Sequence, residues 1–356
     1  MKKIIENYRN LKILITGSTG FKGAWLSHWL LNLGAKVTGI GLPAEKDSIL
    51  FKELNLNKRM KQYVFDISNF NNVNDVTKKE KPDLIFHLAA QSIVSLSYTN
   101  PLKTFQSNIL GSANILEAFK NNKVPSMVFI TSDKCYLNLD KKKDYKENDV
   151  LGGLDNYSSS KASAELIFSS YFHSFFKKKT NFLTTGSVRA GNVIGGGDMK
   201  ANRLIPDIVK SIKKNKKIQI RNPYSTRPWQ HVLEPLSGYL VLGQKLLNKK
   251  IKNTTHPSWN FGPEKKNCKN VLTIVKKILT KWPTDRKIII RKEKMHEAKL
   301  LSLNINKVKK ELNWQPKLSL DQTINFTVDW YKKYFEKKNM QSVTTDQINK
   351  YINYKI

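Results

Sequence analysis

Tyr157 and Lys161, which lie four residues apart, are the two side chains of this sequence best suited to acid–base chemistry. Residues at this spacing share one face of a helix, and residues 163–168 are mostly good helix formers. An ammonium one turn from a phenol favours the phenolate, so a tyrosine with a reference pKa of ~10 could act as a general base near neutral pH. Alone, the pair is weak evidence, because chance produces it readily in a lysine-rich chain as an exposed aromatic and a solvated lysine.

A glycine-rich loop far upstream gives the pair a context. Glycines recur as Gly-x-x-Gly-x-x-Gly between the apolar run 13–15 and the amphipathic run 24–31. Such a loop lets the backbone approach a pyrophosphate, and the helix N-terminus adds a favourable dipole. The alternative is a plain turn between strand and helix. Loop and pair together predict a nicotinamide-dependent oxidoreductase scaffold, and the candidate cofactor-binding residues of the loop are Gly17, Thr19, Gly20, Phe21, Lys22 and Gly23.

Length and composition fit this scaffold. A chain of 356 residues can bury a full core and divide into two lobes. No run approaches the ~20 apolar residues that span a bilayer, and the charged N-terminus leads into no signal-like stretch, so we expect no membrane association. Cys135 and Cys268 are too few for a disulfide framework or, by themselves, a structural zinc site. We therefore expect a reducing cytoplasm and no metal centre.

The strongly basic charge has two interpretations. A net charge of +34 and a pI of about 9.9 would ordinarily suggest a nucleic-acid or membrane partner. The excess is almost entirely lysine, spread in short clusters along the whole chain, and no basic groove interleaved with aromatics is visible. We favour a solvated lysine-rich surface over a polyanion site and expect no nucleic-acid partner.

Apolar runs and amphipathic segments alternate through the first half of the chain. This order predicts parallel strands with right-handed crossovers, hence an α/β, doubly wound, Rossmann-type sheet that binds ligands beyond the carboxyl ends of its strands. We expect strands at 13–15, 36–40, 63–65, 84–88, 127–130 and 183–188, and a helix at 108–119. The predicted domains are a cofactor-binding domain over 1–194 with a returning segment near 229–262, an interleaved substrate-binding lobe over 195–335, and a peripheral C-terminal extension over 336–356.

Longer motifs carry a specific resemblance. They are residues 20–23, 87–91, 131–136, 157–161, 188–198, 203–207, 226–235, 260–263 and 296–298. On these stretches the sequence resembles the extended short-chain dehydrogenase/reductases, and within them the CDP-glucose 4,6-dehydratases. The resemblance implies conversion of CDP-glucose to CDP-4-keto-6-deoxyglucose and water, in deoxysugar biosynthesis, with tightly held NAD.

The resemblance also implies a role for each catalytic residue. Tyr157, assisted by Lys161, takes the proton of the sugar 4-hydroxyl. Ser132 hydrogen-bonds the 4-oxygen, Asp133 is the acid at the 6-hydroxyl, and Lys134 is the base at carbon 5. A lysine acts as a base only if its pKa is lowered, which burial near Lys161 could do. The alternative for Asp133 and Lys134 is an exposed ion pair on a surface turn.

Other residues are candidates for binding. For NAD they are Asp66, Ile67, Leu88, Ala89, Ala90, Gln91 and Asn108, beside the loop, Tyr157 and Lys161. For the nucleotide sugar they are Ser132, Asn192, Arg203, Leu204, Arg227, Trp229, His231, His296 and Glu297. A structural role is an equally good interpretation for the two histidines.

The end of the second predicted strand departs from the dinucleotide pattern. Residues 39–43 contain no carboxylate for a ribose 2′-hydroxyl, and Glu45 is only a loose candidate. No arginine points to NADP, although Lys46 could meet a 2′-phosphate. NAD is therefore implied by the resemblance and not by this segment.

Three alternatives to a CDP-glucose 4,6-dehydratase remain open. Another nucleotide-sugar 4,6-dehydratase would carry an acidic residue in place of Lys134, and a 4-epimerase has no use for Asp133 and Lys134. A non-catalytic NAD- or polyanion-binding protein on the same fold is the third.

The resemblance implies a homodimer with a four-helix interface, and we expect an exposed apolar surface formed by Ala113, Leu116, Phe119, Leu166, Phe168 and Tyr171.

Overall fold

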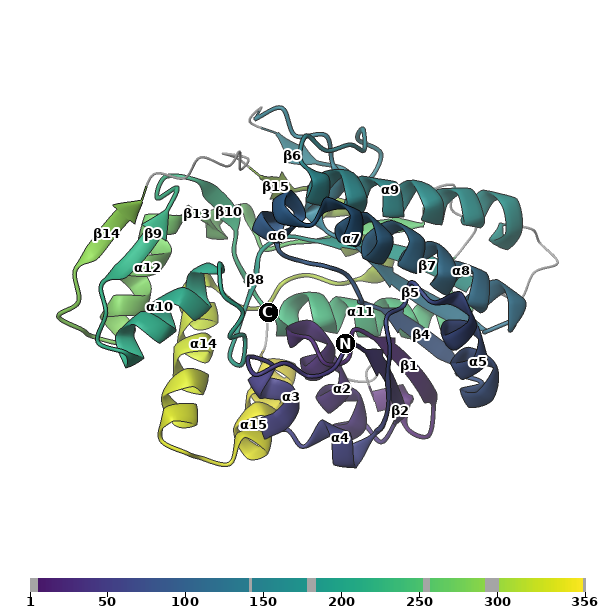
Figure 1. Ribbon diagram of the computed structural model, residues 1–356, viewed down its shortest axis with the longest axis horizontal. Coiled ribbons are helices and arrows are strands. Elements are labelled where there is room, and N and C mark those ends of the chain that lie inside the picture. The colour runs from purple at the N-terminus through teal and green to yellow at the C-terminus, as the bar shows by residue number, and fades with distance from the viewer. Residues whose placement is uncertain (1–5, 141–142, 178–183, 252–256, 292–300, 355–356) are drawn as a thin grey trace.

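A parallel sheet of seven strands forms the centre of the larger lobe (Figure 1). The computed structural model describes residues 6–140, 143–177, 184–251, 257–291 and 301–354. The strand order is β12-β7-β5-β4-β1-β2-β3, and every neighbouring pair runs parallel. The strands are β1 (Lys12–Thr16), β2 (Lys36–Gly41), β3 (Lys61–Val64), β4 (Leu84–His87), β5 (Ser126–Ile130), β7 (Thr184–Ala190) and β12 (Ser258–Phe261).

Successive side chains of each strand alternate between two helical layers. Ile13, Ile15 and Phe86 join one hydrophobic cluster, whereas Leu14 and Ile85 join another on the opposite face. This period of two is the geometry of a strand that is buried on both faces. The first layer contains α2 (Phe21–Asn32) and α11 (Leu233–Leu247), and the second contains α5 (Phe70–Glu80), α8 (Gly111–Asn121) and α9 (Asn156–Tyr171).

The predicted fold class is therefore confirmed, with differences at the element boundaries. The strand expected at 63–65 begins two residues earlier, at Lys61. The helix expected at 108–119 is a π-helical turn, η2 (Gln106–Leu110), that continues into α8. Strand β12 comes from the segment that we expected to return to the sheet, and α11 covers the sheet just before it.

The smaller lobe is assembled mainly from chain that follows β7 and lies at the left of Figure 1. Its largest sheet is the parallel pair β9 (Ile218–Arg221) and β14 (Ile288–Arg291). Three shorter pairs connect it to the larger lobe: β8 (Val193–Ile194) with β11 (Gln230–His231), β10 (Thr226–Pro228) with β13 (Cys268–Asn270), and β6 (Asp144–Tyr145) with β15 (Ser302–Leu303). Its helices are α10 (Leu204–Lys213), α12 (Val271–Lys281), α13 (Asn306–Leu312) and α14 (Leu320–Phe335).

The C-terminal segment is not peripheral, contrary to our expectation. Residues 340–353 form one long helix, α15 (Met340–Asn353), which packs beside α2 and α14. Tyr351 is fully buried, meets the ring of Trp29 edge to face at 6.0 Å, and donates to Glu234 Oε2 at 2.7 Å. The prediction missed a helical stripe with period 3.6, in which the buried residues are Met340, Val343, Thr344, Gln347, Ile348 and Tyr351.

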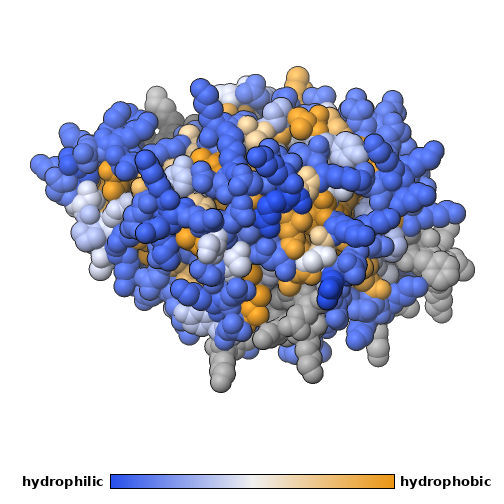
Figure 2. Space-filling model, turned by 90° about the horizontal axis from the view of Figure 1, so that it is seen from below, coloured by the Kyte–Doolittle hydropathy of each residue, from blue (hydrophilic) through white to orange (hydrophobic). Residues whose placement is uncertain are grey.

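Short elements complete the chain. They are η1 (Glu6–Tyr8), α3 (Ile49–Glu53), α4 (Leu56–Arg59), α6 (Val94–Thr99), α7 (Pro101–Phe105), η3 (Asp133–Cys135), η4 (Phe172–Phe176) and η5 (Lys265–Asn267). Among the described helices, none combines the length and apolar character needed to cross a membrane. The face in Figure 2 is mostly hydrophilic, as a lysine-rich surface would be.

Candidate active site

The glycine-rich loop joins β1 to the N-terminus of α2, as predicted. Gly17 has a φ of +75°, and a Cβ atom there would lie 2.8 Å from the backbone nitrogen of Ala89. A Cβ on Gly23 would lie 2.1 Å from the carbonyl oxygen of Gly17. Only glycine permits this tight turn. Because Gly20 occupies the N-cap and no side chain caps α2, its first N–H groups remain available to a pyrophosphate.

The other candidate cofactor residues lie at the same edge of the sheet. Asp66 and Ile67 follow β3, and the Asp66 Oδ1 accepts a hydrogen bond from Ser68 N at 3.0 Å. After β4, the Asn108 Oδ1 accepts from Gln91 N at 2.7 Å, and its amide donates to Ser160 Oγ on α9 at 2.9 Å. Leu88, Ala89, Ala90 and Gln91 are half-buried in this turn, and Thr19 Oγ1 donates to Leu42 O at 3.1 Å.

These residues fit a dinucleotide, although the end of β2 stays without a carboxylate. Glu45, the loose candidate for a ribose contact, is ion-paired with Lys200, its Oε2 lying 2.8 Å from the Lys200 Nζ. The uncapped N-terminus of α2 and the glycine cradle therefore carry the fit for the cofactor, and Asn108 braces the turn at residues 88–91 against α9.

Tyr157 and Lys161 lie on the first turns of α9, as predicted. Asp155 caps this helix by accepting from Ser158 N at 2.9 Å and from Ser158 Oγ at 2.6 Å. Each of the two catalytic candidates is only 6% exposed. The capped first turn thus fixes both side chains in the interior.

Burial reverses the pKa shift that we expected for Tyr157. Desolvation raises the pKa of Tyr157 to about 12, although hydrogen bonding to Ser132 and the charge of Arg203 act to lower it. Desolvation, followed by the nearby charge of Lys22, lowers the pKa of Lys161 to about 7. The expectation rested on the ammonium alone, whereas removal from water is the larger effect on both groups.

Ser132, Asp133 and Lys134 follow directly after β5. Ser132 Oγ donates to Asp133 Oδ1 at 3.0 Å and accepts from Lys134 N at 3.3 Å, which caps η3. Asp133 is buried and Lys134 is half-buried. A surface turn with an exposed ion pair is therefore wrong for Asp133.

The second carboxylate oxygen of Asp133 is buried and has no hydrogen-bond partner in the described parts of the chain. A Cβ on Gly191 would lie 2.8 Å from this oxygen. Desolvation raises the pKa of Asp133, while the charges of Lys134, Arg227 and Lys22 oppose that shift. A buried, unpaired carboxyl oxygen can bond a ligand hydroxyl, and the raised pKa favours the protonated form that donates a proton.

The candidate substrate residues surround this centre. Arg203 caps the start of α10 and donates to Asp198 Oδ2 at 2.9 Å and to Ser92 Oγ at 2.6 Å. Arg227 is buried, and its positive charge acts to lower the pKa of Asp133. Asn192 and Leu204 are half-buried.

Trp229 and His231 are placed differently. Trp229 is buried and its indole donates to Lys269 O at 2.8 Å. His231 is fully buried, with Trp25 and Phe326 edge-on to its ring, and desolvation lowers its pKa to about 3. This packing favours the structural interpretation of His231. His296 and Glu297 lie outside the described residues.

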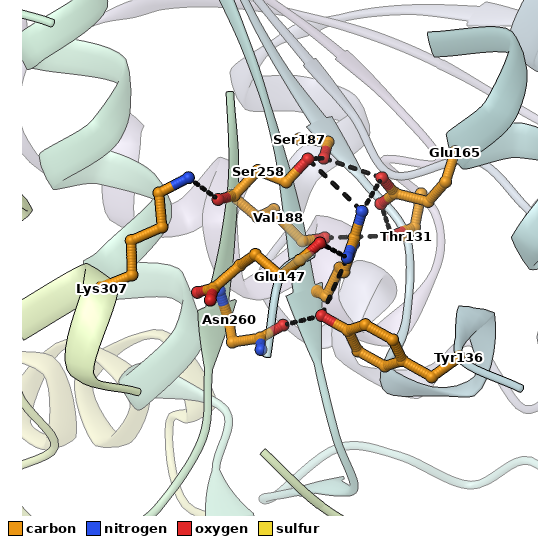
Figure 3. A network of polar contacts seen from close by, with 10 residues as sticks. Thr131, Tyr136, Glu147, Glu165, Ser187, Val188, Ser258, Asn260 and Lys307 are labelled. Atoms are coloured by element: carbon orange, nitrogen blue, oxygen red, sulfur yellow. Dashed lines mark hydrogen bonds and ion pairs between the residues drawn. The ribbon is translucent and has the colours of Figure 1, made fainter. Parts of the chain in front are cut away.

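A buried ion pair that sequence reasoning missed stands behind the catalytic residues (Figure 3). Arg189 Nη2 on β7 lies 2.8 Å from Glu165 Oε2 on α9, and both side chains are almost fully buried. Glu165 also accepts from Thr131 Oγ1 and, at 3.0 Å, from Ser187 Oγ. The signal that could have revealed the pair is the position of Glu165, one helical turn beyond Lys161.

The same network also contacts Tyr136, the residue that follows η3. Arg189 Nη1 donates to the Tyr136 hydroxyl at 2.9 Å, and the guanidinium lies 4.9 Å from the Tyr136 ring centre. The Tyr136 hydroxyl in turn donates to Asn260 Oδ1 on β12 at 2.7 Å. Thr131 and Tyr136 therefore hold Ser132, Asp133 and Lys134 from both ends.

Comparison with known proteins identifies the family. The family described as GDP-mannose 4,6 dehydratase matches residues 14–327. The chain belongs to this family. It is 42% identical to the CDP-glucose 4,6-dehydratase of Salmonella typhimurium over 97% of both chains. It is 26% identical to a UDP-glucuronate 4-epimerase of Thermodesulfobacterium geofontis, over 91% of this chain and 97% of the relative.

Solved structures share the fold of this family member. The dTDP-glucose 4,6-dehydratase of Bacillus anthracis, solved in complex with NAD, superposes with a TM-score of 0.76 at 24% identity over 93% of this chain and 99% of that one. An epimerase of Methanothermobacter thermautotrophicus superposes with a TM-score of 0.81 at 22% identity, over 94% and 96%. Epimerases and dehydratases thus share the scaffold.

We predict that Arg189→Met destabilises the protein strongly, because it leaves the Glu165 carboxylate buried without its cation. Breaking one side of a buried pair costs ~3–5 kcal/mol, which thermal and urea unfolding would register. The double change Arg189→Met with Glu165→Leu should recover much of the loss, since no isolated charge then remains. Lys333→Met, which breaks the exposed pair with Asp329, is the control and should change stability little. Unfolding of Arg189→Met at the wild-type midpoint would contradict the prediction.

Proposed function

We propose that this protein is a CDP-glucose 4,6-dehydratase, a lyase that converts CDP-glucose to CDP-4-keto-6-deoxyglucose and water. The observation that carries the proposal is the buried Asp133, whose Oδ1 accepts a hydrogen bond from Ser132 and whose Oδ2 has no partner among the described residues. Tyr157, hydrogen-bonded to the same Ser132, places an acid for the 6-hydroxyl next to a base for the 4-hydroxyl. Identity of 42% over nearly the whole length to a CDP-glucose 4,6-dehydratase supports the substrate.

The cofactor of this proposal is NAD. The glycine loop, the open N-terminus of α2, Asp66 and the turn braced by Asn108 would hold it. When bound, the nicotinamide supplies the acceptor and donor of a hydride. The protein's task is to hold the sugar against that ring and to move protons at three sugar positions.

The first proton to move is that of the 4-hydroxyl. Tyr157 takes it as the base; desolvation raises the pKa of Tyr157 to about 12, and the hydrogen bond to Ser132 and the charge of Arg203 act against that shift. Ser132 also hydrogen-bonds the 4-oxygen. Lys161, whose pKa of about 7 lets it gain and lose a proton near neutrality, carries the proton onward.

Elimination then needs one base and one acid. The 4-keto group acidifies the hydrogen at carbon 5, and Lys134 is the base that removes it. Asp133 protonates the departing 6-hydroxyl, which leaves as water. Its raised pKa favours the carboxylic acid that this step consumes.

A 4-epimerase on the same scaffold is the runner-up. It requires Tyr157 and Lys161 but gives a buried carboxyl beside Ser132 no task. A dehydratase for another nucleotide sugar would use the same centre, so the nucleotide must be tested directly. Incubation with CDP-, dTDP-, UDP- and GDP-glucose, followed by the alkaline absorbance of a 4-keto-6-deoxy product, tests both points. A carbon 4 epimer without exchange of the carbon 5 hydrogen would defeat the proposal.

We expect Tyr157→Phe to lower turnover of CDP-glucose by ~10²–10⁴-fold, the range for a positioned acid–base group. The aromatic ring remains, so nucleotide binding, measured by calorimetry with CDP, should stay close to wild type. Turnover near that of the wild type would remove Tyr157 from the mechanism.

Lys134→Ala should separate elimination from oxidation. Without the base at carbon 5, we expect 4-keto-6-deoxy product and hydrogen exchange at carbon 5 to slow by ~10²–10⁴-fold. Oxidation at carbon 4 should persist, so quenching with borodeuteride should place deuterium at carbon 4 of a sugar that keeps its 6-hydroxyl. Lys78→Ala, on the exposed face of α5, is the matched control. Product formation at an undiminished rate in Lys134→Ala would assign the base to another residue.

We also propose a homodimer, on a smaller apolar surface than the sequence suggested. Leu116, Phe119 and Phe168 are in the sheet core and are not exposed, because they face the strands. The exposed apolar side chains that remain on these helices and the turns beside them are Leu102, Leu110, Leu166 and Phe175, between 41% and 81% exposed. Exposure of these apolar side chains to water is unfavourable, so a second copy of the chain that buries them would be stabilising.

Leu166→Lys should therefore weaken self-association. Light scattering of the wild type at micromolar concentration should give twice the chain mass, and the variant should shift toward the monomer because it buries a charge in the interface. Leu139→Lys, an exposed leucine on another surface, is the control. A monomeric wild type would refute the dimer and leave the catalytic proposal intact.

A further inference from the structure

A polar cavity lies between α6 and the smaller lobe. Its volume is about 1030 Å³, and its lining includes Ser95 of α6, Asn202 and Gln219 of β9. Arg203, the neighbour of Asn202, bonds Ser92 and Asp198 and contributes to the pKa of Tyr157. Through its neighbour Asn202, Arg203 thus links the lining of the cavity to the electrostatic environment of Tyr157.

The lining is strongly cationic. Lys210, Lys216, Lys217, Arg221 and Arg291 all contribute to it. Such a set suits the diphosphate of a nucleotide sugar, because ammonium and guanidinium groups both pair with phosphate oxygens. A carboxylate in this lining would repel the diphosphate, so its presence requires another explanation.

Asp207 is nevertheless in this cavity, as the sole carboxylate among its described lining residues. It lies in the first turn of α10 and is half-buried. Its pKa is raised by desolvation, against the charges of Arg221 and Lys210 and a hydrogen bond from the backbone of Asn202.

No side chain of the described residues forms an ion pair or a hydrogen bond with the Asp207 carboxylate, although cations are close. Lys210 Nζ donates to Met199 O at 2.6 Å, and among the contacts of Arg221 is a hydrogen bond from Nη2 to Asn202 O at 3.0 Å. The Asp207 carboxylate therefore keeps acceptor capacity that no side chain of the described residues uses. In a binding cavity, a ligand N–H can satisfy it.

The nucleobases differ at the position that such a carboxylate would contact. Cytosine carries an amino group at carbon 4, and a carboxylate accepts its hydrogen bond. Uracil and thymine carry a carbonyl oxygen there, which a carboxylate repels. Guanine offers N–H donors as well but is a larger purine.

We propose that Asp207 accepts a hydrogen bond from the cytosine amino group and so selects a cytidine nucleotide over uridine and thymidine nucleotides. The inference deepens the proposed function, on which its choice of cytosine over guanine rests. The cationic side chains of the cavity then hold the diphosphate, between the base at Asp207 and the glucose at Tyr157.

Calorimetry with CDP, UDP, dTDP and GDP tests the selection without requiring catalysis. The wild type should bind CDP ~10–10²-fold more tightly than UDP or dTDP, the discrimination of one well-placed base contact. Asp207→Asn can offer either an oxygen or an amino group, so the CDP-to-UDP ratio should fall about tenfold or more. The ratio of kcat/KM for CDP-glucose over UDP-glucose should fall in parallel.

Asp329→Asn makes the same chemical change on α14, away from the cavity, and should leave both ratios unchanged. Thermal unfolding of Asp207→Asn should match the wild type, since no side-chain partner is lost. A CDP preference retained in a folded Asp207→Asn would overturn the proposal, and so would tighter wild-type binding of GDP than of CDP. A wild type that prefers CDP but makes no 4-keto-6-deoxy sugar would refute the dehydratase and leave the base selection standing.

Discussion

The ion pair between Arg189 and Glu165 is the interaction on which the geometry of the catalytic centre depends. It joins β7 to α9 at 2.8 Å in an almost water-free interior. Burying two charges is expensive, and Thr131, Tyr136 and further partners offset the cost by satisfying most of the remaining donors and acceptors, Arg189 Nε excepted. Those partners are the flanks of the Ser132–Lys134 segment. The hydrogen bonds that stabilise the buried charges therefore also fix the position of the Ser132–Lys134 segment.

Desolvation sets the electrostatic character of the site. It lowers the pKa of Lys161 to about 7 and that of Lys22 to about 8, and it raises the pKa of Asp133. Each shift moves a group toward its neutral form, and the two lysines come to titrate near physiological pH. Proton transfer costs least between groups of similar pKa. Tyr157 is the exception, because desolvation raises its pKa to about 12 and so moves it away from that of Lys161.

Features that depend on one short stretch of sequence were predicted correctly, whereas features that depend on the packing of distant elements were missed. The glycine loop and the Tyr157–Lys161 pair are short patterns whose geometry follows from one loop or one helix, and both were found where expected. The raised pKa of Tyr157 was missed because burial is a property of the folded chain. The Arg189–Glu165 contact joins two elements, and neither residue type alone indicates its partner. Tyr351 was assigned to the periphery because its neighbours in sequence are polar, although it packs on Trp29.

The same constraint explains how one scaffold serves both epimerases and dehydratases. Thr131 and Tyr136 are held by the buried network, whereas Ser132, Asp133 and Lys134 between them point into the site or its edge. A change at Lys134 leaves the ion pair and the sheet in place, whereas Ser132 caps η3 and Asp133 is buried, so changes there also affect the local structure. In the proposed mechanism, Tyr157 and Lys161 would serve oxidation at carbon 4 in either case, with NAD as the hydride acceptor. The segment Ser132–Lys134, which the buried network holds at both ends, would then add the elimination.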